Sequence, residues 1–185
     1  MRAYMKKAYL LLPAVLLIFS VSLSTFAKAD SVFMITSPAI TPGKTIPALF
    51  TCKGRNISPP LSWSDPPAET KSLVLVVDDP DAPSGTFTHW IAWNLPPKAG
   101  SLPEGASGNA GMIKMVEGIN DFYRTGYGGP CPPPGLPHHY RFTLYALDTR
   151  INLSPRATRR RLDEAISGHV IKSAGFSAQF AITGP

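Results

Sequence analysis

The sequence lacks the short motifs that mark the commonest catalytic and metal sites. It contains no GxSxG nucleophile elbow, no HExxH zinc motif and no Gly-rich phosphate loop. It has only two cysteines, Cys52 and Cys131, and neither belongs to a CxxC pair, so the spacing typical of metal ligands is absent. These absences argue against the familiar hydrolases, zinc proteins and nucleotide-binding enzymes. We therefore expect a protein without enzymatic activity, without a metal and without a cofactor.

Long apolar runs are also scarce, because only the N-terminal segment contains one. A basic start precedes an apolar run from Ala8 to Phe26, which is followed by the small-x-small sequence Ala27-Lys28-Ala29. This pattern predicts an export signal over residues 1–29 and one mature domain over residues 30–185. A membrane anchor is the alternative, but Pro13 and the Ala-x-Ala end favour cleavage. We expect an exported protein, either periplasmic or secreted.

Excess charge of one sign is nearly absent once this signal is removed. The whole chain has 18 Lys and Arg against 12 Asp and Glu, a formal net charge of +6. Four of the basic residues lie in the predicted signal, which leaves 14 against the same 12 and a net charge of +2. The remaining cluster Arg159-Arg160-Arg161 lies beside Asp163 and Glu164, as on a solvated helix face. The charge therefore predicts no nucleic-acid partner.

Short β-rich segments dominate the mature sequence. The clearest are two runs rich in apolar and β-branched residues, Leu73–Asp78 and His89–Leu95, followed by a third at Tyr140–Leu147. Further strands are expected at residues 32–36, 45–52, 61–63, 112–116 and 176–182. The predicted fold class is mostly β: an antiparallel β-sandwich with a C-terminal helix.

Local patterns refine this prediction at two places. A period of two along His89–Leu95 puts His89 on the same face as Ile91, Trp93 and Leu95. Ser154 and Pro155 are typical of a helix N-cap and first helical position, and Gly175 is expected to end that helical element. The segment from Pro96 to Gly111 is expected to have little regular structure.

The two cysteines leave two alternatives open. In an exported protein, two thiols are typical of one disulfide, here Cys52–Cys131. Two free thiols are the other alternative, because the sequence does not give the distance between them. Cys131 lies in a long segment rich in Pro and Gly, residues 121–137, and such a long loop in a compact domain is typical of a functional site.

Polar side chains gather at the ends of the predicted strands. The candidates for chemistry are Asp79, Asp81, His89, His138, His139 and Tyr140. A period of two puts His138 and Tyr140 on one strand face. Each candidate also has an ordinary structural role: the aspartates beside prolines are common turn formers, and Tyr140 could simply pack in the sheet.

Four stretches together resemble the phosphatidylethanolamine-binding protein family, especially its bacterial branch similar to the Raf kinase inhibitor protein. They are NISPPLSW (Asn56 to Trp63), DPDAP (Asp79 to Pro83), His89-Trp90 and GGPCPPPGLPHHY (Gly128 to Tyr140). The resemblance covers nearly all of the mature chain. It implies a β-sandwich with a small anion-binding pocket at one end. The residues it implies for ligand binding are Asp79, Asp81, His89, Pro132, Pro133, His138 and Tyr140.

The resemblance also implies details and departures. A cis peptide is expected at Ala82-Pro83, because proline is the residue for which that isomer costs little. Eukaryotic members have a longer loop before the pocket histidine that contributes a tyrosine, whereas this chain has Phe87, which cannot donate a hydrogen bond. His139 stands where a basic residue is usual.

The implied function is binding of phosphate or a phosphoethanolamine-like lipid head group, with peripheral membrane contact. Two carboxylates would repel a phosphate unless a histidine is protonated, one Asp is protonated, or the ligand is zwitterionic. The alternative function is inhibition of a protease or another protein partner. The long loops at 96–111 and 121–137 could present such a surface around the pocket.

Overall fold

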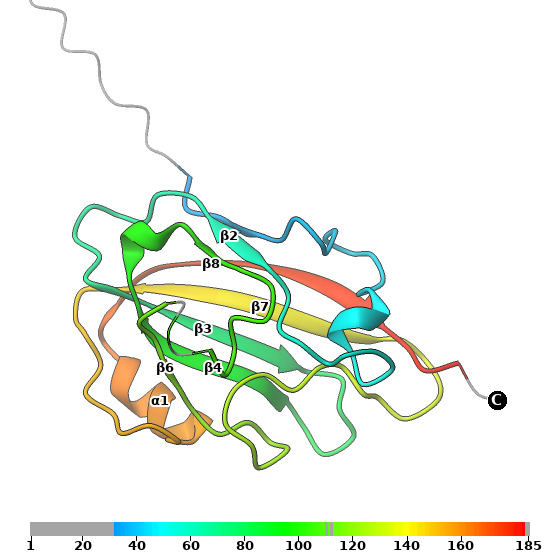
Figure 1. Cartoon of the computed structure of the whole chain (residues 1–185). Helices are drawn as coiled ribbons and strands as arrows, with labels where there is room; N and C mark the ends of the chain where they lie inside the picture. The colour runs from blue at the N-terminus through cyan, green and yellow to red at the C-terminus, as the bar shows by residue number, and fades with distance from the viewer. Residues whose placement is uncertain (1–31, 110, 112, 184–185) are drawn as a thin grey trace, which may run out of the picture. The chain divides into compact units, whose positions relative to one another are not determined.

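The computed structural model describes residues 32–109, 111 and 113–183, and the predicted signal over residues 1–29 lies outside them (Figure 1). The described chain forms two antiparallel sheets. The larger sheet has the order β6 (Val116–Glu117), β4 (Phe87–Leu95), β3 (Ser72–Asp79), β7 (His138–Leu147) and β8 (Val170–Phe180). The smaller sheet has the order β1 (Ile35–Thr36), β2 (Leu61–Trp63) and β5 (Ser101–Leu102). This arrangement confirms the predicted mostly-β, antiparallel fold.

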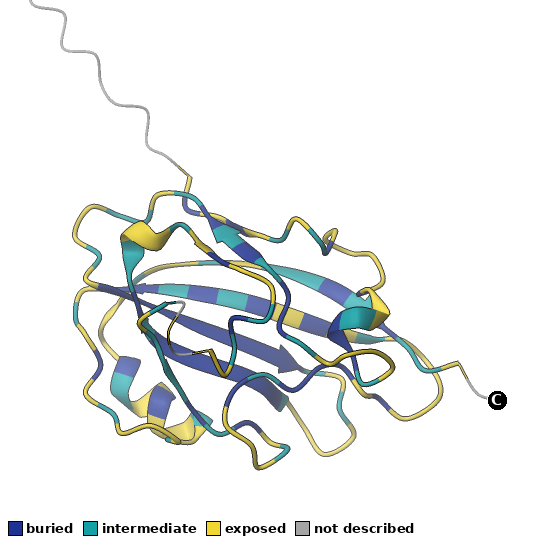
Figure 2. Cartoon of the chain, in the orientation of Figure 1, coloured by how far each residue is buried: buried dark blue, intermediate teal, exposed yellow. Residues whose placement is uncertain are grey.

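The larger sheet is covered on both faces. One face packs against the smaller sheet, around a core that includes Leu61, Leu75, Trp90 and Phe142. The other face packs against the helix α1 (Arg159–Ile166), around a second core that includes Val76, Trp93, Leu162 and Ile166. Because both faces are covered, every residue of β3 is buried (Figure 2). This explains the continuous apolar run from Leu73 to Val77.

A β-bulge near the start of β4 turns His89 toward the interior between the sheets. The pairing of β3 with β4 shifts between Val77 and Asp78, which leaves His89 as an extra residue in β4. Its ring packs against Tyr140, a member of the core between the sheets, whereas Ile91 belongs to the core under α1. The predicted alternation, which put His89 and Ile91 on one face, is wrong here because the bulge interrupts it.

A second bulge lies at the other end of β4. The register shifts between Leu73 and Val74, and the extra residue Asn94 has a φ of 59°. The side-chain amide of Asn94 donates to the Ile151 carbonyl at 2.8 Å and accepts from the Ile151 backbone N–H at 2.9 Å. Leu95 is consequently in the core between the sheets, so its predicted face is also wrong.

The helix begins later than the sequence predicts. Thr158, rather than Ser154, is the N-cap, and its hydroxyl accepts from the backbone N–H of Arg161 at 3.5 Å. Pro155 instead lies in a turn with Arg156, whose φ of 70° is left-handed and cannot continue a right-handed helix.

The last strand is longer than predicted and includes Gly175. A Cβ atom at this position would lie 3.0 Å from the carbonyl oxygen of Phe142, so glycine allows β7 and β8 to approach closely. The next residue, Phe176, stacks on the Phe142 ring at 4.8 Å. Gly175 therefore does not end a helical element, because β8 pairs with β7 on both sides of it.

Other local predictions are corrected in the N-terminal half and the loops. The expected strand at residues 45–52 is replaced by a 3₁₀ helix, η1 (Ala48–Phe50), that follows Pro47, and Thr45 makes only an isolated bridge. The segment 96–111 contains a second 3₁₀ helix, η2 (Pro97–Ala99), and β5. The described residues contain no cis peptide, so the Ala82-Pro83 bond is trans. Across the same residues, no helix has the length and apolar character needed to cross a bilayer.

Candidate functional site

A cavity of about 260 Å³ lies where β3 ends and where β4 and β7 begin. The antiparallel order β4-β3-β7 brings these three strand ends to one edge of the sheet, although they are far apart in sequence. The wall includes six of the seven residues that the sequence pointed to, namely Asp79, His89, Pro132, Pro133, His138 and Tyr140. It also includes Ala82, Pro83, Ser84, Phe87, Phe122 and Cys131.

Asp81, the seventh predicted residue, does not line this cavity. Its Oδ2 atom accepts from the backbone N–H of His139 at 2.8 Å and from His139 Nδ1 at 2.7 Å, on the exposed side of β7. Hydrogen bonding to His139 lowers the pKa of Asp81. The backbone N–H of Asp81 also donates to Asp79 Oδ1 at 2.8 Å. Asp81 therefore fastens the turn after β3 to β7 and helps to orient Asp79.

Asp79 and His138 form a buried pair inside the cavity. The distance between His138 Nδ1 and Asp79 Oδ2 is 2.7 Å, and the side chains are 13% and 5% exposed. With its carboxylate ionised, Asp79 accepts, so His138 donates from Nδ1. Nε2 of His138 then has no hydrogen-bond partner in the described structure.

His89 is held by a hydrogen bond to a loop carbonyl. Its Nδ1 lies 2.6 Å from the carbonyl oxygen of Gly128, which can only accept, so Nδ1 carries the hydrogen. The ring lies 5.1 Å from Phe87, 5.3 Å from Phe122 and 5.1 Å from Tyr140, measured between centroids. Burial lowers the pKa of His89, and this outweighs the opposite effects of the Gly128 carbonyl and the nearby carboxylates. His89 is therefore a neutral ring at neutral pH, with Nε2 as an acceptor.

Tyr140 contributes its hydroxyl to this cavity. The residue is fully buried, and its oxygen has no partner at normal hydrogen-bond distance in the described structure, although the Asp79 carboxylate is near enough to interact weakly with it. Burial raises the pKa of the Tyr140 phenol, and the charge of the nearby Asp79 carboxylate raises it further. The hydroxyl thus stays protonated and can donate. A buried hydroxyl without a close partner costs stability, and a ligand acceptor in the cavity would offset that cost.

A disulfide fixes the loop that forms the proline-rich wall. Cys52 and Cys131 are bonded, with 5.4 Å between their Cα atoms, so the disulfide alternative is correct for this structure. Pro132 and Pro133 follow directly, and the loop is also tied by a hydrogen bond from the Cys52 N–H to the Pro130 carbonyl at 3.1 Å. These constraints hold the wall in place.

Several wall residues were missed by the sequence reasoning. Phe122 packs edge-on against Phe87 at 4.7 Å and closes one side of the cavity. Its position in the long loop at residues 121–137 was the only signal that could have indicated it. Cys131 also lies in the wall, and only its closeness in sequence to predicted site residues pointed to it.

The donor set of the cavity suits a small polar ligand. Within the described ranges, no group of three His, Cys, Asp or Glu side chains is arranged to hold a metal ion. The cavity offers the hydroxyls of Tyr140 and Ser84, one carboxylate and two imidazole Nε2 atoms, framed by aromatic and proline side chains. Such a site can hold a small ligand that carries both hydrogen-bond acceptors and donors.

Comparison with known proteins agrees with this geometry. The family description "Phosphatidylethanolamine-binding protein" matches residues 36–181, and the chain belongs to this family. A UPF0098 protein from Pyrococcus horikoshii is 53% identical over 69% of this chain, and the match spans 66% of that protein, just under two thirds of its length.

Two further relatives extend this comparison. The crystal structure of a phosphatidylethanolamine-binding protein homologue from Chlamydia trachomatis has a TM-score of 0.75 and 41% identity, covering 81% of this chain and 97% of that one. LppC from Mycobacterium tuberculosis, which is named as a lipoprotein, is 44% identical over 80% of this chain and 72% of its own.

Proposed function

We propose that the cavity binds a small phosphate-bearing ligand of the phosphoethanolamine type. The observation that carries this proposal is the buried Tyr140 hydroxyl, which has no close hydrogen-bond partner among the described residues and belongs to the wall of a cavity with two histidines. A phosphate oxygen would accept from this hydroxyl and relieve its cost. The cavity is small, so few ligand atoms are buried and the affinity is that of a head group, at most about 1.5 kcal/mol per non-hydrogen atom.

The arrangement of donors favours a zwitterion. Both imidazoles donate from Nδ1 to the protein, so their Nε2 atoms accept while the rings are neutral. A ligand ammonium group can donate to Asp79 or to an imidazole Nε2, and the phosphate can accept from Tyr140. A purely anionic ligand lacks these donors and requires a protonated histidine instead.

We propose that this site binds without catalysing a reaction. Ser84 is the one serine among the wall residues. Its side chain makes no hydrogen bond to a histidine in the described structure. A serine needs such a base to act as a nucleophile. Inhibition of a protease or another protein remains a second prediction, which depends on the loops around the cavity.

We also propose that the chain is exported. The Cys52–Cys131 disulfide supports this, because disulfides persist mainly in oxidising compartments. A relative named as a lipoprotein supports it as well. Mass spectrometry of the protein purified from its natural compartment should find a new N-terminus near Asp30. An intact Met1 on the purified protein would contradict the proposal.

NMR titration of the histidine side chains tests the ligand. Adding phosphoethanolamine should shift the His89 and His138 resonances at millimolar concentration, with smaller effects from ethanolamine. Tyr140→Phe should weaken binding about tenfold, the effect of losing a hydrogen bond to a charged group, without lowering the melting temperature. Tyr145→Phe, on the α1 side of the sheet, is the matched control. Absence of any shift at millimolar ligand would overturn the proposal.

A further inference from the structure

We propose that the cavity is one end of a longer binding groove for an extended peptide of a partner protein. The inference rests on the proposed phosphate site and extends it. A second hollow of about 130 Å³ adjoins the cavity, and the two share Phe122 and Cys131 as wall residues. A third hollow of about 350 Å³ adjoins the second, and these two share Asn56 and Tyr127. We call this row of three hollows the groove.

The residues shared between the hollows are held rigidly. Asn56, with a φ of 56°, accepts through Oδ1 from the Gly129 N–H at 2.7 Å. The Tyr127 hydroxyl donates to the Phe50 carbonyl at 2.7 Å, and Cys131 is fixed by the disulfide. The groove is therefore formed before a ligand arrives, so binding costs little ordering of the protein.

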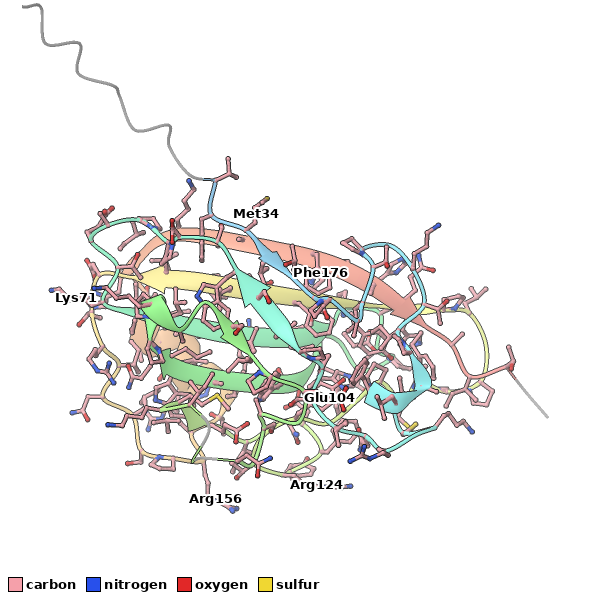
Figure 3. The ribbon with its side chains drawn as sticks, turned by 45° about the horizontal axis from the view of Figure 1, so that its top comes forward. Met34, Lys71, Glu104, Arg124, Arg156 and Phe176 are labelled. Atoms are coloured by element: carbon pink, nitrogen blue, oxygen red, sulfur yellow. A yellow bond between two sulfur atoms is a disulfide. The ribbon has the colours of Figure 1, made fainter. Side chains whose placement is uncertain are left out.

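The lining changes in character along the groove. The cavity has aromatic and proline walls, the second hollow combines Asn120 and Arg124 with Phe122 and Tyr127, and the third is mainly polar, with Arg55, Ser58 and Glu104. Figure 3 labels Arg124 and Glu104, which come from two different loops of this surface. Arg55, Arg124 and Glu104 are exposed and make no ion pair with another described residue.

This chemistry fits a peptide better than a lipid tail. An acyl chain that followed the groove would reach the mainly polar third hollow, where burying apolar surface gains little. An extended peptide advances about 3.3 Å per residue and offers a backbone donor and acceptor at each one. The order of charges predicts its sequence: a phosphate in the cavity, an acidic residue beside Arg124, and a basic residue farther on near Glu104.

Synthetic peptides test both the groove and the order of charges. The probe is a capped hexapeptide, phosphoserine-Gly-Asp-Gly-Ser-Lys, with the Asp and Lys exchanged in a control of identical composition. The reversed chains of both peptides are also measured, and capped phosphoserine alone reports on the cavity. In one of the two chain directions, the peptide with the original order of Asp and Lys should bind at least about fivefold more tightly than capped phosphoserine alone. The reason is that two exposed charge pairs are added.

Variants test whether the added affinity of the hexapeptide comes from contacts in the groove. Arg124→Gln should remove most of the added affinity while leaving the Kd of phosphoserine within about twofold, as expected for an exposed charge outside the cavity. Arg150→Gln, an exposed arginine beyond the other end of β7, is the matched control and should change neither. Equal binding of all peptides and phosphoserine overturns the groove and leaves the cavity proposal intact. Failure of both capped phosphoserine and phosphoethanolamine to bind overturns the proposed function, whereas binding of phosphoethanolamine without binding of phosphoserine overturns the peptide groove alone.

Discussion

His138 Nδ1 lies 2.7 Å from Asp79 Oδ2, so the first residue of β7 is tied to the last residue of β3. The two residues are 59 positions apart in sequence. The contact closes the edge of the larger sheet around the cavity and puts a carboxylate beside a site that we propose for a phosphate group. This carboxylate would repel the phosphate group unless a positive charge offsets it. We propose that Asp79 pairs with the ammonium group of a zwitterionic ligand.

Asp79→Asn distinguishes recognition of the ammonium group from recognition of the phosphate group. The Asn carbonyl can still accept from His138 Nδ1, so the imidazole keeps its orientation. Loss of the negative charge should weaken phosphoethanolamine binding roughly tenfold, because a charge-assisted hydrogen bond to the ammonium group is lost. Inorganic phosphate should bind as well as before or more tightly, because one repulsive charge is gone. Calorimetric titration with both ligands measures the change in selectivity.

A second Asp–His pair provides the control for this variant. Asp148 pairs with His169 at 2.9 Å, with both side chains about half exposed, away from the cavity. Asp148→Asn should leave the Kd of both ligands unchanged. If Asp79→Asn weakens phosphate and phosphoethanolamine equally, Asp79 acts by shaping the cavity and the zwitterionic arrangement is wrong.

The pH dependence of anion binding follows from His89. In the free protein, burial lowers the pKa of His89 below its ordinary value, so the ring is neutral at pH 7. A dianion bound next to it favours the imidazolium and raises this pKa. Between the lower free pKa and the higher bound pKa, binding takes up one proton. Affinity should therefore rise as the pH falls, by at most about tenfold per pH unit for one proton.

Sulfate is the suitable probe, because it stays a dianion across this range while phosphate itself titrates. Its Kd should be lower at pH 5.5 than at pH 8, and His89→Gln should flatten the profile. His169→Gln, which changes an exposed histidine outside the cavity, should leave the slope unchanged. A slope that persists in His89→Gln and disappears in His138→Gln would assign the proton to the other imidazole.

The sequence predicted most of the fold because its strongest signals are local. The apolar runs of β3, β4 and β7 have the length and composition of buried strands, and the structure has strands there. The resemblance then indicated six of the cavity residues. It also indicated Asp81, whose side chain bonds His139 outside the cavity; only the three-dimensional path of the turn distinguishes Asp81 from Asp79.

The errors arise where tertiary contacts override a local pattern. Strict alternation cannot reveal the bulge at His89, because the extra residue is defined by the partner strand β3. Ser154-Pro155 has the composition of a helix start, but the chain first makes a turn at Arg156. The pairing of β8 with β7 likewise outweighs the helix-ending preference of Gly175. In each case the deciding interaction joins residues that are distant in sequence or depends on a specific turn.

The buried ion pair between Arg159 and Asp78 should stabilise the domain through Asp78. Arg159 donates to both carboxylate oxygens of Asp78, at 2.6 and 2.7 Å, and the Asp78 side chain is only 9% exposed. Arg159→Ala leaves this carboxylate buried without its cation. The free energy of unfolding should fall by about 2–3 kcal/mol, less than for a fully buried pair because Arg159 is partly exposed. Urea denaturation measures it.

The neighbouring residue on α1 is a matched control. Arg160 pairs with Glu164 at 2.8 Å, but its side chain is 76% exposed, so Arg160→Ala should change the free energy of unfolding by well under 1 kcal/mol. Equal losses in the two variants would mean that helix propensity or packing, rather than the charge left on Asp78, causes the effect.

Reduction of the Cys52–Cys131 disulfide should weaken both the fold and the cavity. The bond joins residues 79 positions apart, so it restricts the unfolded chain strongly, and its loss should cost about 2–4 kcal/mol of unfolding free energy. Cys131 is also a wall residue next to Pro132, so phosphoethanolamine binding should weaken in the Cys52→Ser, Cys131→Ser double variant. Urea denaturation and ligand titration, each with and without reductant, measure the two effects. The double variant should be insensitive to reductant. A reduced wild-type protein with unchanged stability would show that hydrogen bonds alone, such as that from Cys52 to Pro130, hold this loop.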